Sequence, residues 1–113
     1  MSTISTHILD TSLGCPAEGV PLILEARTDE GWRPIGGGTT NADGRVVDLL
    51  RDGESLLVGI YRMSFETGIY FDAQAIRSFY PVVRVVFEVE DPDSHYHVPL
   101  LLSPFGYSTY RGS

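Results

Sequence analysis

The stretch VPLILEART, residues 20–28, alternates its side chains in the way that a β-strand requires. Every second residue from Val20 to Ala26 is apolar, whereas Glu25 and Arg27 belong to the opposite face. Successive side chains of an extended chain point to opposite faces, so this period of two predicts a half-buried strand. We therefore expect a β-strand over residues 20–28 with one face in the core.

Four further stretches are rich in the β-branched and aromatic residues that strands favour. They are LLVGIYRMSFETGIYF (residues 56–71), PVVRVVFEVE (81–90), HYHVPLLLS (95–103) and GYSTYRG (106–112). Turn-forming residues separate the strands at 29–32, 36–45, 51–55 and 90–94. Short strands at this spacing predict an all-β sandwich or barrel.

One stretch departs from the strand pattern. In FDAQAIRSFYP, residues 71–81, Asp72 is a suitable N-cap, the residues after it favour a helix, and Pro81 would end it. We expect one short helix of about two turns there. No internal repeat or linker divides the 113 residues, so we expect a single domain spanning residues 1–113.

The stretch PVVRVVFEVE is apolar on both faces of the expected strand. One face carries Val83, Val85, Phe87 and Val89, and the other carries Val82 and Val86. A strand with one face in solvent needs fewer apolar residues than this. Two explanations stay open: a central strand within one subunit, or an edge strand buried against another copy of the chain.

Composition excludes several classes of partner. The formal net charge is −7, and the 8 Lys and Arg residues are scattered, so a nucleic-acid surface is not expected. No apolar run approaches the roughly 20 residues of a membrane-spanning helix.

Cys15 is the single cysteine, which favours a reducing compartment, and the first residues lack the pattern of a signal peptide. We therefore expect a cytoplasmic protein.

The histidines are informative by their placement. His95 and His97 are two positions apart in an expected strand, so their side chains share one face about 7 Å apart. They could be ordinary polar residues at the start of that strand, or a catalytic pair. With His7 they could also form a zinc site, since His-x-His on a strand is a familiar ligand pair. No carboxylate has an obvious supporting role, and we expect neither metal nor other cofactor.

TNADGR, residues 40–45, is a turn motif that would hold Arg45 at the start of a strand. A guanidinium in such a place stays protonated and suits a carbonyl oxygen that becomes negative during acyl chemistry. The nearby GGG, residues 36–38, is not followed by a helical pattern, so a bulged strand is expected rather than a phosphate-binding loop. The common catalytic motifs, such as GxSxG and HExxH, are absent from the sequence.

Four blocks together resemble the 5-hydroxyisourate hydrolases, the transthyretin-related enzymes of urate degradation. They are STHILDT (residues 5–11), TNADGR (40–45), YFDAQAIRSFYP (70–81) and HYHVPLLLSPFGYSTYRGS (95–113). The resemblance covers the chain from about Thr3 to Ser113, and the final YRGS is its most specific element. It implies a transthyretin-like sandwich of two four-stranded sheets with one short helix. It also implies a homotetramer with its sites at the interface between dimers.

The same resemblance implies the site residues. The catalytic set would be His7, Arg45, His97 and Ser113. The substrate would be bound by His7, Arg45, His95, Tyr110, Arg111 and Ser113. Ser113 would offer a hydroxyl and an α-carboxylate, which is ionised at neutral pH because its reference pKa is about 3.5.

The implied reaction is attack of water on a ring acyl carbon of 5-hydroxyisourate, giving 2-oxo-4-hydroxy-4-carboxy-5-ureidoimidazoline. We expect His97, supported by His7, to activate the water, and Arg45 to stabilise the oxyanion. Ser113 would orient a histidine or the substrate, or, alternatively, act as a covalent nucleophile. Two other function classes stay open: a non-enzymatic carrier of small ligands of the transthyretin type, and a non-catalytic interaction module.

Overall fold

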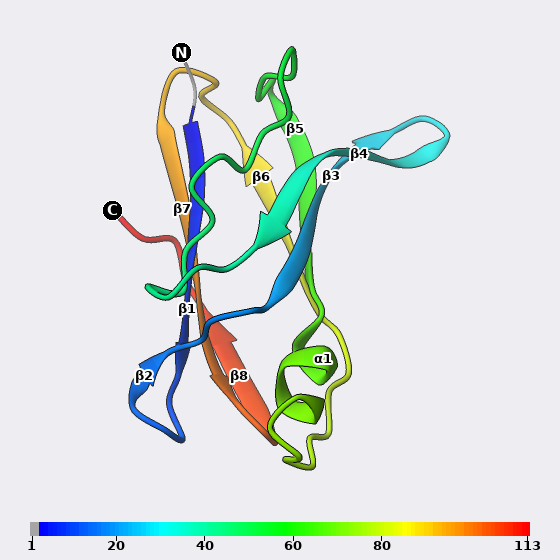
Figure 1. The fold of residues 1–113 in the computed structure, drawn as a ribbon. Coiled ribbons are helices and arrows are strands. Elements are labelled where there is room, and N and C mark those ends of the chain that lie inside the picture. The colour runs from blue at the N-terminus through cyan, green and yellow to red at the C-terminus, as the bar shows by residue number, and fades with distance from the viewer. Residues whose placement is uncertain (1–2) are drawn as a thin grey trace.

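The computed structural model describes residues 3–113 as two four-stranded sheets and one short helix (Figure 1). In chain order the elements are β1 (Thr3–Asp10), β2 (Cys15–Pro16), β3 (Pro21–Thr28), β4 (Gly31–Thr39), β5 (Gly59–Phe65), α1 (Thr67–Asp72), β6 (Val83–Val89), β7 (His95–Ser103) and β8 (Gly106–Thr109). One sheet has the order β2-β1-β7-β8 and the other β4-β3-β5-β6. The predicted sandwich is confirmed. Within the described residues, no helix is long and apolar enough to span a membrane.

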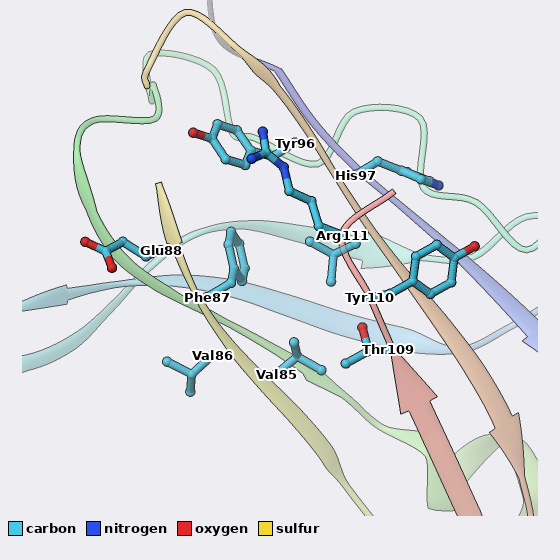
Figure 2. Close-up of a pocket in the computed structure, with 10 residues that line it drawn as sticks. Val85, Val86, Phe87, Glu88, Tyr96, His97, Thr109, Tyr110 and Arg111 are labelled. Carbon is cyan, nitrogen blue, oxygen red and sulfur yellow. The ribbon is translucent and has the colours of Figure 1, made fainter. Parts of the chain in front are cut away.

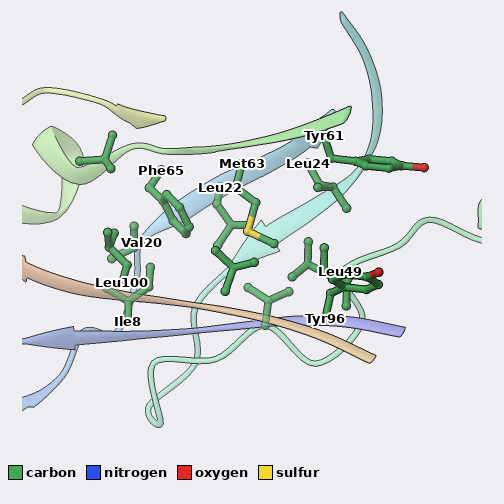
Figure 3. Packing of buried hydrophobic residues seen from close by; sticks show 14 of the residues in the cluster. Ile8, Val20, Leu22, Leu24, Leu49, Tyr61, Met63, Phe65, Tyr96 and Leu100 are labelled. Atoms are coloured by element: carbon green, nitrogen blue, oxygen red, sulfur yellow. The ribbon is translucent and has the colours of Figure 1, made fainter. Parts of the chain in front are cut away.

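The core lies between the inner faces of the two sheets (Figure 3). Leu22 and Leu24 of β3 are buried, as the alternation of residues 20–28 predicted. From the opposite sheet, Ile8 of β1 and Leu100 of β7 are fully buried in the same cluster. Apolar burial of this kind is the main favourable contribution to folding, so the alternation of each strand fixes which face points inward.

Strands β1 and β7 lie side by side and run parallel, in register from Thr3 opposite His95 to Asp10 opposite Leu102. The other strand pairs of the two sheets are antiparallel. Along β1 the even-numbered residues are buried and the odd-numbered ones face outward. The outer face of the β1–β7 pair is therefore polar at the end where Thr3, Ser5 and His7 lie beside His95 and His97.

The predicted helix over residues 71–81 is wrong in position. Helix α1 covers Thr67–Asp72, so Asp72 ends the helix instead of capping its start, and the predicted strand over residues 56–71 stops at Phe65. The sequence of α1, TGIYFD, is rich in β-branched and aromatic residues, which made it look like a strand. Packing outweighs this propensity, because Thr67 and Phe71 are buried.

Strand β2 and the first part of β4, residues 31–35, were not predicted, and the turns expected at 29–32 and 36–45 overlap the two ends of β4. Pro34 and the glycines of β4 are residues that strands disfavour. The expectation of a bulged strand at GGG is confirmed. Leu24 pairs with Gly36 and Glu25 pairs with Pro34, which leaves Ile35 as the extra residue. A Cβ added at Gly36 would lie 1.9 Å from the carbonyl oxygen of Leu49, so only glycine allows this approach of the two backbones.

Strand β6 is an edge strand, since β5 is its single neighbour in the sheet order of the described residues. The central-strand explanation for its two apolar faces is therefore wrong. Val86, on its outer face, is 57% exposed. An edge of this kind presents backbone donors and acceptors that can pair with another chain.

A buried carboxylate ties the turn after β1 to helix α1. Oδ2 of Asp10 accepts a hydrogen bond of 2.7 Å from the hydroxyl of Tyr70. Oδ1 accepts bonds from the backbone N–H and hydroxyl of Ser12 and from the backbone N–H of Leu13. Burial raises the pKa of Asp10, but these hydrogen bonds outweigh it and hold the pKa below its ordinary value. The carboxylate is therefore ionised and fully engaged at neutral pH.

We predict that Tyr70→Phe lowers the free energy of unfolding by about 1–3 kcal/mol at neutral pH, because it leaves a buried carboxylate oxygen without its donor. Urea unfolding measures this, with Tyr107→Phe on β8 as the control at an exposed tyrosine.

The folded pKa of Asp10 is depressed, so the stabilisation that its carboxylate provides is present above the unfolded pKa and is lost as the pH falls through the folded pKa. The difference between wild type and Tyr70→Phe should shrink under those acidic conditions. Equal stability of the two proteins at pH 7 would contradict the role given to this bond.

Candidate functional site

Three histidines lie on strands of the β1–β7 pair, at positions that alternate with buried residues. His95 and His97 share the outer face of β7, with ring centroids 6.4 Å apart and ring planes 16° apart. This confirms the shared face predicted from their spacing. His7 occupies the same face of β1, two residues beyond Ser5, which pairs with His97. The parallel register thus places Ser5 and His7 beside His95 and His97, which are about 90 positions away in the chain.

The turn at residues 41–44 holds Arg45 beside this face. The side-chain Oδ1 of Asn41 accepts a bond from the backbone N–H of Arg45, and Gly44 has a φ of +74°. The carbonyl of Gly44 accepts a bond from the backbone N–H of Ile8, which attaches the turn to β1. Arg45 forms a single bridge with His7, so the predicted turn is confirmed, whereas the expected strand after Arg45 is wrong.

The segment after β8 runs back along β7. Gly112 forms a bridge with His97 and donates a backbone bond of 2.8 Å to its carbonyl oxygen. A Cβ added at Gly112 would lie 2.4 Å from Cδ2 of the His97 ring. The glycine of YRGS therefore allows the chain to pass directly against this imidazole, and it places exposed Ser113 one residue beyond.

Tyr110 and Arg111 point to different sides of this segment. The guanidinium of Arg111 lies 4.6 Å from the ring centroid of Tyr96, a buried residue on the inner face of β7. Figure 2 shows this stacking, and it shows Tyr110 on the side toward which His97 points. Arg111 also borders a cavity of about 230 Å³ whose apolar lining includes Phe87 of β6. His97 and Tyr110 border the same cavity, so Arg111 meets one of the three histidines there while its guanidinium stacks on Tyr96.

Sequence reasoning missed two hydroxyl groups at this site. The hydroxyl of Ser5 lies 2.8 Å from Nδ1 of His97 and 3.1 Å from Nε2 of His95. The hydroxyl of Thr3 contacts Nδ1 of His95. The spacing of Thr3, Ser5 and His7 at alternate positions was the available signal, but it does not reveal which strand lies beside them.

The environment of His97 keeps its imidazole neutral. Burial is the largest cause of a lowered pKa for this residue, followed by the positive charge of Arg45 and the neighbouring His95 and His7. A backbone hydrogen bond with Ser5 acts in the opposite direction. Within residues 3–113, His, Cys, Asp and Glu side chains do not gather in a group of three that could hold a metal ion. The arrangement offers a neutral base beside a permanent cation.

Residues 4–112 match the family model described as HIUase/Transthyretin. The chain belongs to this family. It is 46% identical over 110 residues to the 5-hydroxyisourate hydrolase of Salmonella typhimurium, with 97% of this chain and 80% of that protein covered. The range matched by the family model includes His7, Arg45, His95 and His97.

Solved structures of the family have the same fold. The structure of Klebsiella pneumoniae 5-hydroxyisourate hydrolase is 38% identical with a TM-score of 0.84, covering 98% of this chain and 99% of that one. Sea bream transthyretin in complex with thyroxine is 35% identical with a TM-score of 0.89, covering 96% and 93%. The fold is therefore shared by an enzyme and by a protein that binds a small ligand, so the fold by itself does not distinguish the two functions.

We predict that the pKa of His97 lies below the ordinary histidine value of about 6.5 and rises in Arg45→Gln, because the substitution removes a nearby positive charge. Titration of the three histidines by NMR measures both values. Arg33→Gln is the matched control, since Arg33 lies on β4 of the other sheet and pairs with Glu54. An unchanged His97 pKa in Arg45→Gln would show that the guanidinium does not act on the imidazole.

Proposed function

We propose that this protein hydrolyses 5-hydroxyisourate, opening its six-membered ring to give 2-oxo-4-hydroxy-4-carboxy-5-ureidoimidazoline. The observation that carries the proposal is that His95 and His97 share one face with His7, beside the turn that holds Arg45. Opening the ring requires a nucleophilic water, a stabilised oxyanion and a proton for the departing nitrogen. The relatives named 5-hydroxyisourate hydrolase support the choice of substrate.

His97 is the general base in this proposal, with His7 in support. A base must be unprotonated at the working pH, and burial and Arg45 hold the pKa of His97 down. Its Nδ1 is engaged with Ser5, so Nε2 is the nitrogen that would take the proton of the attacking water. The imidazolium formed in this way can then return the proton to the leaving nitrogen of the ring.

Arg45 stabilises the oxyanion that forms when water adds to the ring carbonyl. Its backbone is fixed by Asn41 and by the bridge to His7, while its side chain is exposed to an incoming substrate. A cation that is held in place before the reaction stabilises the developing charge without reorganisation. The positive charge of Arg45 also lowers the pKa of His97, so the residue that stabilises the oxyanion also helps to keep the general base unprotonated.

Ser113, His95 and Tyr110 complete the substrate contacts in this proposal. The pairing of Gly112 with His97 supports a place for Ser113 near the imidazole, where its hydroxyl would orient the ring or the substrate. The guanidinium of Arg111 stacks on Tyr96 by its face, which leaves its N–H groups available to a substrate that reaches the cavity shared with His97. We favour direct attack by water over a covalent Ser113 intermediate, because the exposed Ser113 hydroxyl has no preorganised base bonded to it among the described contacts.

The proposal includes a homotetramer with sites at the interface between dimers. Strands β6 and β8 each end a sheet, so their backbone groups are available to a second copy. The exposed Val86 on β6 supports burial of this edge in an assembly. The outer face of the β1–β7 pair, which carries the histidines, would then line a cleft between copies.

A carrier of small ligands is the second candidate, because sea bream transthyretin was solved in complex with thyroxine. A carrier needs a binding cleft but no general base and no oxyanion partner. It would bind its ligand without accelerating ring opening.

We predict that the wild-type protein accelerates the ultraviolet decay of 5-hydroxyisourate made in place by a urate oxidase. His97→Asn and Arg45→Gln should each lower kcat by about 10² or more, as expected for a lost base or oxyanion partner. Arg33→Gln on β4 is the control and should keep the wild-type rate. A wild-type protein that leaves the spontaneous decay unchanged would overturn the proposed function in favour of the carrier. An acyl adduct on Ser113, seen by mass spectrometry, would overturn the choice of direct attack.

A further inference from the structure

A continuous series of polar contacts crosses the outer face of the sheet from β1 to β7 and back. Thr3 contacts Nδ1 of His95, and Nε2 of His95 lies 3.1 Å from the hydroxyl of Ser5. The same hydroxyl lies 2.8 Å from Nδ1 of His97. Ser5 is therefore the one group that touches both imidazoles among the described contacts.

The hydroxyl of Ser5 has a single proton, so it can donate to one imidazole only and must accept from the other. In the first arrangement, Nδ1–H of His97 donates to Ser5, Ser5 donates to Nε2 of His95, and Nδ1–H of His95 donates to Thr3. In the second arrangement all three bonds are reversed. Both satisfy every donor and acceptor in the series, so the direction of the bonds decides the tautomer of His97.

The two arrangements differ in what Nε2 of His97 can do. In the first, Nε2 has no proton and its lone pair can accept one from water. In the second, Nε2 carries the proton of the neutral ring and cannot act as a base. The positive charge of Arg45 disfavours a second proton on His97, and Nε2 is the ring nitrogen that Ser5 does not contact. The role of general base requires the first arrangement.

We propose that Ser5 is a positioning residue that holds His97 in the Nδ1–H tautomer and connects it to His95. This inference rests on the proposed function, since it specifies how the general base is prepared. The contacts of Ser5 with both imidazoles also give the proton a route from His97 to the exposed His95. When Nε2 of His97 takes a proton, its Nδ1 proton can pass to Ser5 while the hydroxyl proton passes to Nε2 of His95.

The shift balances protons and charge. His97 takes one proton from the water and gives one to Ser5, Ser5 gives its own proton to His95, and the positive charge ends on His95. His95 is exposed to solvent, whereas His97 is half-buried, so the charge moves to the better-hydrated ring. Return of the same protons restores the imidazolium of His97 for protonation of the leaving nitrogen. The charged and titratable groups that lower the pKa of His97 are Arg45 from the turn, His7 from β1 and His95 from β7, and Tyr110 and Arg111 border the same cavity as His97.

The test compares the tautomer of His97 in wild type, Ser5→Ala and Ser5→Thr by ¹⁵N NMR of the labelled histidines, at a pH of about 8, above the ordinary histidine pKa of about 6.5. Protonated and unprotonated ring nitrogens have distinct shifts, and the measurement needs no substrate. We expect Nδ1–H for His97 in wild type and in Ser5→Thr, which keeps a hydroxyl in a residue that strands accept. In Ser5→Ala we expect loss of this preference.

The kinetic arm uses the same variants in the ring-opening assay. Ser5→Ala should lower kcat about tenfold or more, a part of the 10²-fold or larger contribution of a general base. Ser5→Thr should recover most of the rate. Ser103→Ala is the control, because Ser103 lies at the far end of β7 and donates only to the carbonyl of Gly106 among the described contacts.

The outcomes separate this inference from the proposed function. An Nε2–H tautomer in wild type, or a tautomer unchanged in Ser5→Ala, overturns the inference whether or not the protein turns over 5-hydroxyisourate. Equal loss of rate in Ser5→Thr and Ser5→Ala also overturns it, because packing and not the hydroxyl would then be responsible. Absence of turnover in wild type, with the tautomer change intact, contradicts the proposed function alone.

Discussion

The parallel pairing of β1 with β7 is the constraint on which the fold and the site both depend. In register, it sets Ser5 opposite His97 and Thr3 opposite His95, with His7 on the same face. The alternate residues of the same two strands are buried between the sheets. A shift of either strand by one residue would turn the histidines into the core and the apolar residues outward, so hydrophobic burial fixes the polar face as well.

Two close backbone contacts add the remaining groups to this face, and each depends on a glycine. Gly44 lies against the carbonyl of Ile8, which brings the turn with Arg45 to the edge of β1. Gly112 lies against the ring of His97, which brings the chain after β8 alongside β7. A Cβ at either position would meet an atom at 2.4 Å, so a larger residue at either one would require its neighbour to shift. The guanidinium that arrives in this way also helps to keep the imidazole neutral.

Patterns within one strand were predictable, whereas relations between distant strands were not. The bounds of β7 followed from its composition, and the shared face of His95 and His97 followed from their spacing of two. Helix α1 was misplaced because local propensity favoured a strand and tertiary packing decided otherwise. The contacts of Ser5 with His95 and His97 could not be predicted, because a single sequence does not reveal that β1 pairs with a strand about 90 residues away. The stacking of Arg111 on Tyr96 was not predicted either, because residues 95–113 were interpreted as one motif and the directions of their side chains after β8 were not distinguished.

We propose that the substrate reacts on the outer face of the β1–β7 pair and not in the apolar cavity beside β6. A crystal structure with a hydrolysis-resistant analogue of 5-hydroxyisourate tests it most directly. The account predicts a ring carbonyl oxygen within hydrogen-bond distance of the guanidinium of Arg45, and a water between the ring and Nε2 of His97. An analogue bound beneath Arg111 and Tyr96 in the cavity, with the histidine face empty, would contradict it.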